Sequence, residues 1–166
     1  MPKQTLYILV FIGILSLIFF GCKEDQAKNA LAENARGWKY IDDGKYSEAI
    51  TIGEQMVKEY PGTKFESYGY LIMWYGFEKQ GQLDEAIDAV RKAYDAVDNT
   101  KDIPDEMKKE SKVYALIRLA NLLEQKGEAN EARETLLRIQ QDYPGTEHAR
   151  EASEKLEALI QKQSVK

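Results

Sequence analysis

The sequence predicts an all-α fold that is built as a repeat array of helix–turn–helix units. One short pattern occurs three times, in which glycine is followed four residues later by glutamate and then by alanine. The three copies are Gly44, Glu48 and Ala49; Gly81, Glu85 and Ala86; and Gly127, Glu131 and Ala132. Apolar residues recur at steps of three and four on both sides of each glycine, as they do in amphipathic helices. Since glycine readily ends a helix and alanine lets two helices approach closely, each copy marks a turn between packed helices. A helix pair that is repeated in this way is typical of a solenoid.

The apolar periodicity defines seven helices in order. We expect them over residues 27–42, 47–59, 63–80, 84–98, 104–126, 130–142 and 146–161. Pro104 suits the first turn of the fifth helix, and Asp105 and Glu106 favour its positive end. The seventh helix has one apolar face and charges elsewhere, which is typical of the capping helix that a repeat array requires. No segment shows the alternation of a strand.

A second motif, Tyr-Pro-Gly-Thr, ends two of the units, at residues 60–63 and 143–146. Together the two motifs resemble the tetratricopeptide repeat, whose unit is about 34 residues long. This resemblance implies a TPR-like right-handed α-solenoid in residues 30–166, with units at about 30–63, 67–98 and 113–146 and a capping helix at about 146–162. Several features depart from the family pattern, and two of them bear on the packing and the spacing of the units. Trp74 stands where a small residue is usual, so we expect looser helix packing there, and the spacing from Ala86 to Ala132 implies an insertion near residues 99–109.

The N-terminal segment resembles a bacterial lipoprotein signal peptide. Lys3 precedes an apolar stretch over residues 6–20, which is typical of an export signal. Gly21 and Cys22 follow, and a small residue before cysteine at this place resembles a lipobox. The resemblance implies that residues 1–21 are removed, that Cys22 carries acyl chains such as palmitate, and that residues 22–29 form a tether. An uncleaved anchor helix and a plain secretory signal are the alternatives.

The residues after Cys22 bear on location. Lys23, Glu24 and Asp25 resemble the surface-export signal of Bacteroidetes lipoproteins, although a solvated tether explains them equally well. Aspartate does not follow the cysteine directly, so the enterobacterial signal for retention in the inner membrane is not matched. We therefore expect a lipid-anchored protein of the bacterial cell envelope, at the outer membrane, with its periplasmic or surface face left open.

Composition argues against several functional classes. The net charge of −5 argues against a nucleic-acid partner, because phosphate binding requires a basic surface. With one cysteine and one histidine, Cys22 and His148, the chain has neither a disulfide framework nor a metal cluster. It also lacks a glycine-rich phosphate loop, a paired-histidine metal motif and a nucleophile elbow. We expect no enzyme activity, cofactor or metal.

The candidate functional surface is the concave groove that the resemblance implies. In this family, fixed positions of the first helix of each unit line that groove and bind a protein or peptide partner. Transferred to this chain, these positions give Leu31, Asn34, Trp38, Tyr68, Leu71, Tyr75, Lys79, Tyr114, Ile117 and Asn121. Aromatic residues with a polar tip suit such a surface, because they bury area and tolerate water when free. Alternatively, the capping helix or the tether already covers this stripe.

These observations predict a lipid-anchored adaptor of the cell envelope that binds a protein segment in its groove. The Tyr-Pro-Gly-Thr joints are similar to those of envelope repeat lipoproteins of the β-barrel-assembly and Tol–Pal-coordinator type. The alternative is a structural subunit of an outer-membrane assembly complex, or a self-assembling scaffold. The sequence leaves the partner and the oligomeric state open.

Overall fold

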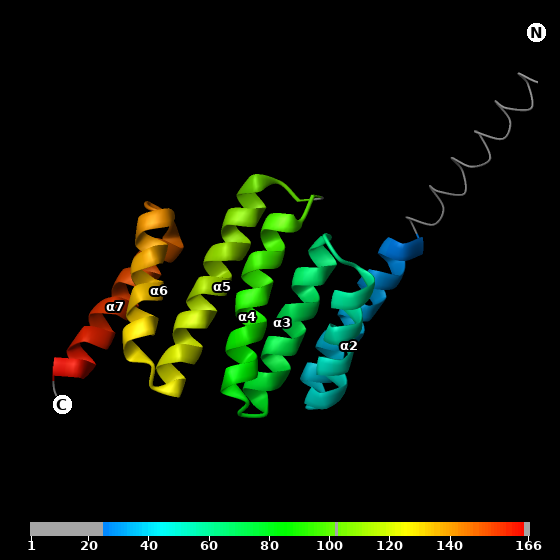
Figure 1. Ribbon diagram of the computed structural model, residues 1–166, viewed down its shortest axis with the longest axis horizontal. Helices are drawn as coiled ribbons and strands as arrows, with labels where there is room; N and C mark the ends of the chain where they lie inside the picture. The colour runs from blue at the N-terminus through cyan, green and yellow to red at the C-terminus, as the bar shows by residue number, and fades with distance from the viewer. Residues whose placement is uncertain (1–24, 102, 165–166) are drawn as a thin grey trace, which may run out of the picture.

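The computed structural model describes residues 25–101 and 103–164, and the fold in these residues is an all-α, TPR-like solenoid (Figure 1). A first helix covers residues 25–42 and is followed by six more. These are α2 (Tyr46–Glu59), α3 (Lys64–Lys79), α4 (Leu83–Asn99), α5 (Asp105–Lys126), α6 (Ala129–Asp142) and α7 (Glu147–Ser164). The predicted helices are therefore confirmed, with ends that differ by at most three residues. The predicted signal peptide and Cys22 lie outside the described residues.

Glycine forms the turns in both kinds of joint. The first helix of each unit ends at a glycine, namely Gly44, Gly81 or Gly127, with φ of 73°, 75° and 90°. Residues other than glycine rarely adopt a positive φ. In the two Tyr-Pro-Gly-Thr joints the glycine again has positive φ, and the threonine begins the next helix. Thr63 Oγ1 accepts a hydrogen bond from the backbone N of Phe65, as an N-cap residue does.

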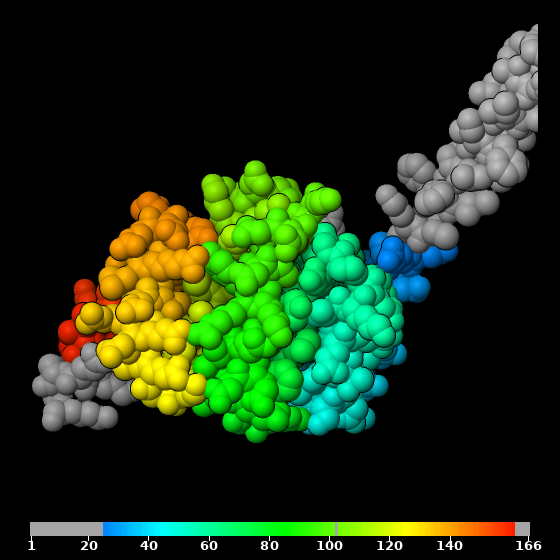
Figure 2. Space-filling view, in the orientation of Figure 1, coloured from blue at the N-terminus to red at the C-terminus, as the bar shows by residue number. Residues whose placement is uncertain are grey.

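The helices pack as a zigzag in which each helix contacts the next one along the chain. The apolar residues form three clusters that follow one another along the array. α4 and α5 have 17 and 22 residues, and the turn that joins them projects beyond its neighbours (Figure 2). This projection lies where the sequence predicts an insertion.

α2 and α3 cross at two glycines that face each other. A Cβ atom at Gly69 would lie 2.7 Å from the carbonyl oxygen of Gly53, and one at Gly53 would lie 2.6 Å from that of Gly69. Gly76 makes a third close approach, since its Cβ would lie 2.7 Å from Ile50 Cγ1. The small residues of the repeat motif were predicted from the sequence, but this crossing was not.

A bulky residue separates α3 from α5. In the third unit, Ala120 occupies the small position of the repeat, and α7 lies close to α5 there, with Ala152 in the same cluster. In the second unit Trp74 occupies that position and is only 3% exposed. No Cα atom of α3 lies within 8 Å of one in α5. The looser packing expected at Trp74 is therefore present, and it creates a gap between the two helices.

Candidate binding groove between α3 and α5

The upper part of the gap is a largely apolar pocket of about 290 Å³. Tyr68 and Leu71 line it from α3, Val97 from α4 and Tyr114 from α5, and His148 borders it from α7. Tyr114 is 37% exposed, while Tyr68 and Leu71 are half-buried. The pocket therefore offers apolar walls with tyrosine at the edge, and in the described residues neither α7 nor the first helix fills it.

The lower part of the gap is a more polar pocket of about 450 Å³. It lies between α3, α5 and α7, and its lining includes Trp74, Glu78, Arg118, Asn121 and Lys155. The Lys155 ammonium donates a hydrogen bond to Asn121 Oδ1 at 3.1 Å. This contact joins the capping helix to the end of the groove.

A row of aromatic rings lies along the gap. Trp38 contacts Tyr75 edge to face with ring centroids 5.9 Å apart, and Tyr75 contacts Trp74 at 5.4 Å. Trp74 in turn meets Tyr114 at 6.4 Å, so the row crosses from α3 to α5. Edge-to-face pairs at these distances are favourable beyond the area they bury, so the row fixes the width of the gap.

Arg118 lines the lower pocket, and its guanidinium lies against two aromatic rings. Its guanidinium carbon lies 4.8 Å from the Tyr114 ring centroid and 5.8 Å from that of Trp74. Its Nε is buried without an acceptor, and so is Nε1 of Trp74. Two adjacent N–H donors at the groove thus lack partners within the part of the chain that the structure describes.

The structure places most of the predicted groove residues near one another, but they do not form one uniform stripe. Tyr68, Leu71 and Tyr114 share the upper pocket and Asn121 lines the lower one. Trp38 and Tyr75 belong to the aromatic row, and the ammonium of Lys79 lies over the Tyr75 ring at 5.1 Å. Leu31 and Asn34 lie on the first helix, where Leu31 is 55% exposed and Asn34 is half-buried with its Oδ1 unpartnered.

Ile117 corrects the predicted lining. It is 4% exposed and packs in the cluster with Leu136, Ile139 and Ala152. The physical reason is that α7 folds back onto α5 and α6 and covers this face of α5. Ile117 therefore supports the groove from beneath, and its side chain is not available to a partner.

Sequence reasoning missed three residues that border the groove. Arg118 lies one helical turn after Tyr114, so spacing by four residues was a signal that could have found it. Lys155 and His148 come from α7, and their approach to α5 depends on how the capping helix folds back. Trp74 was predicted to depart from the repeat pattern, but its role in opening the gap was not predicted.

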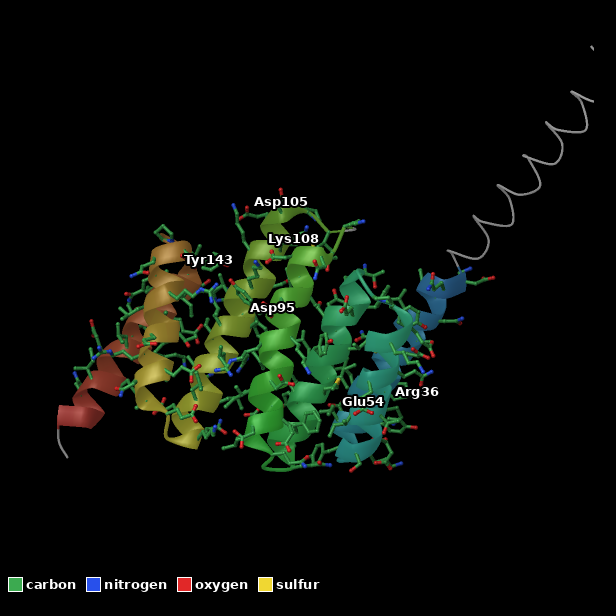
Figure 3. The ribbon with its side chains drawn as sticks, viewed as in Figure 1. Arg36, Glu54, Asp95, Asp105, Lys108 and Tyr143 are labelled. Atoms are coloured by element: carbon green, nitrogen blue, oxygen red, sulfur yellow. The ribbon has the colours of Figure 1, made fainter. Side chains whose placement is uncertain are left out.

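The rest of the described surface has fewer features that suggest a binding site. Charged side chains such as Arg36, Glu54 and Asp95 point outward from the first helix, α2 and α4 (Figure 3). Residues 25–101 and 103–164 contain no group of three or more His, Cys, Asp or Glu side chains that could hold a metal ion. Among the helices in these ranges, none is long and apolar enough to span a bilayer.

Comparison with known proteins agrees with the third unit of the array. The family model described as Tetratricopeptide repeat matches residues 114–146, which contain most of α5, all of α6 and the second Tyr-Pro-Gly-Thr joint. The matched segment begins one residue after the predicted start of the unit. No curated protein matches the chain. Tetratricopeptide repeats are generally non-catalytic scaffolds that mediate interactions between proteins.

Proposed function

We propose that this chain is a lipid-anchored adaptor of the bacterial cell envelope, and that it holds a segment of a protein partner between α3 and α5. The repeat match supports a role in protein–protein interaction. The observation that carries the more specific proposal is the upper pocket, in which Tyr68, Leu71 and Tyr114 surround about 290 Å³ of open space.

The physical properties of this pocket favour a side chain as its occupant. An apolar group that enters it would remove the walls from water and gain about 25 cal/mol per Å² of buried apolar area. The hydroxyl-bearing ring of Tyr114 stays partly exposed, so it tolerates water in the free protein and still provides contact area in the complex. Small concave sites of this kind commonly hold the residues that dominate binding energy.

The anchor is proposed on the N-terminal sequence alone. Gly21 and Cys22 follow an apolar stretch, and lipidation at Cys22 would hold the protein stably at a membrane when several acyl chains are attached. Residues 25–29 already belong to the first helix, so the repeat domain would lie close in sequence to a lipidated Cys22. We propose an outer-membrane location because aspartate, which signals retention in the inner membrane, does not directly follow Cys22. A scaffold within an outer-membrane assembly complex is the alternative.

The proposed function needs no chemistry of its own. Protein binding by packed side chains requires neither a cofactor nor a metal, and the net charge of −5 disfavours nucleic acid as the partner. The only histidine, His148, borders the upper pocket, where we assign it to the rim.

The test is crosslinked co-purification from membranes. The Tyr68→Ala/Tyr114→Ala variant removes two walls of the upper pocket, and Tyr70→Ala on α3 is the matched control because its neighbours are Glu66, Asp88 and Lys92. We expect the double variant to lose proteins that both the native chain and the control retain. Identical sets of co-purified proteins from all three chains, each with native helicity, would refute the groove as the working surface.

A further inference from the structure

Among residues 25–101 and 103–164, the Arg118 side chain has no partner of opposite charge. Its guanidinium makes no ion pair or hydrogen bond within the described residues, whereas Arg91, Arg138 and Arg150 each pair with a carboxylate. The rings of Trp74 and Tyr114 attract its charge, but they supply no acceptor for its N–H groups. A buried donor without an acceptor costs free energy, so the free protein would be stabilised by a group that accepts a hydrogen bond from Arg118.

The neighbouring polar groups do not accept a hydrogen bond from the Arg118 side chain. Lys155 donates to Asn121, and Glu78 Oε1 accepts from Gln125 Nε2 at 3.4 Å. Glu124 also lines the lower pocket and has a partner of its own. Both acids of the lower pocket therefore have partners other than Arg118, and the group that would satisfy Arg118 is an additional hydrogen-bond acceptor. A carboxylate matches best, because guanidinium presents a planar fork of donors that binds it bidentately.

The distance along α5 relates this acceptor to the apolar pocket. Tyr114 and Arg118 are four residues apart, which corresponds to about 6 Å along a helix. In an extended peptide, side chains at positions i and i+2 point to the same face and are about 6.6 to 7 Å apart. One extended segment can therefore place an apolar side chain in the upper pocket and a carboxylate at Arg118.

From these contacts we infer that the groove recognises an extended partner segment in which a bulky apolar residue lies two positions from aspartate or glutamate. The apolar side chain occupies the upper pocket, and the carboxylate binds Arg118. The lower pocket of about 450 Å³ continues past Arg118, so the segment runs on and the carboxylate belongs to a side chain within it. This inference rests on the proposed function of the groove.

The test is selection from a displayed library of random ten-residue peptides on the full chain in mild detergent. The peptides are fused at both ends, so that no terminal carboxylate is free, and a second library carries free C-termini. The selections are repeated with Arg118→Met, whose apolar chain still covers Trp74 and Tyr114, and with Arg133→Met, which removes an exposed charge on α6. Circular dichroism checks that both variants keep native helicity.

We expect peptides from the fused library to carry an apolar residue two positions before or after an acid. They should bind Arg118→Met roughly tenfold to a hundredfold more weakly and bind Arg133→Met unchanged. If selected peptides require Tyr114 but show no acidic preference, or bind Arg118→Met equally well, the inference is wrong and the groove proposal survives. An acidic preference found only at free C-termini would also overturn it. If no peptide depends on Tyr68 or Tyr114, the proposed function fails with it.

Discussion

The crossing of α2 and α3 allows a quantitative prediction for Gly69→Ala. Helix propensity alone predicts that this substitution stabilises the protein by about 1 kcal/mol, because glycine is unfavourable inside a helix. The structure predicts the opposite. The new Cβ would lie 2.7 Å from the carbonyl oxygen of Gly53 and 3.0 Å from Val57 Cγ2. The nearest atom is backbone, so relief requires the two helices to separate.

The expected size follows from these opposing terms. Inserting a methyl group into a packed interface typically costs about 1 to 3 kcal/mol, and separating the helices adds the loss of neighbouring contacts. After the gain in propensity, we expect the free energy of unfolding to fall by about 1 to 2 kcal/mol. For a chain of this length, that corresponds to a decrease in melting temperature of about 2 to 8 °C.

The assay is urea and thermal denaturation, followed by circular dichroism of the full chain in mild detergent. Gly53→Ala is the reciprocal variant, since its Cβ would lie 2.6 Å from the carbonyl oxygen of Gly69. The double variant should cost less than the sum of the two single ones, because the first alanine has already separated the helices. A stabilised Gly69→Ala protein, or strictly additive effects, would show that α2 and α3 are not in backbone contact here.

Three further predictions concern other parts of the molecule. Trp74→Ala should lower the free energy of unfolding by about 3 to 5 kcal/mol, because it removes a buried side chain and leaves a cavity in the core between α3 and α5; a change below about 1 kcal/mol in urea denaturation would contradict this role. Burial, assisted by Glu33 at Tyr60 and by a hydrogen bond with Tyr94 at Tyr143, raises the pKa of each tyrosine from 10.0 to about 12. The contribution of the two neutral hydroxyls to stability is therefore complete below pH 10 and is lost as the pH rises towards 12. The Tyr60→Phe/Tyr143→Phe variant should accordingly lose less stability between pH 8 and pH 11 than the native chain. Equal losses of stability would refute the raised pKa values. Cys22→Ser should abolish labelling by a fatty-acid analogue and release the protein from membranes, whereas unchanged labelling would exclude lipidation at the only cysteine of the chain.

Local patterns predicted the helices well, because each boundary depends on residues close to it in sequence. Glycine at 44, 81 and 127 ends a helix by its own backbone freedom, and Thr63 caps the next helix two residues before Phe65. Residues near each boundary therefore contain the information that sets it. The same holds for Trp74, whose size alone shows that the regular packing of the repeat cannot continue.

The groove was harder to predict, because it depends on contacts between distant elements. The position of Ile117 in the repeat suggested a groove residue, but α7 buries it. Lys155 reaches Asn121 from 34 residues away, which no local spacing reveals. The lack of a partner for Arg118 is likewise visible only when all its neighbours are placed.

The gap at Trp74 also has a mechanical consequence. On the groove side, α3 and α5 are joined by side chains alone, while α4 packs against both helices behind them. We therefore expect the angle between the two halves of the array to change about α4, because no backbone contact joins α3 to α5 directly. A segment bound beside Trp74 and Tyr114 would therefore change the distance between the first helix and α7.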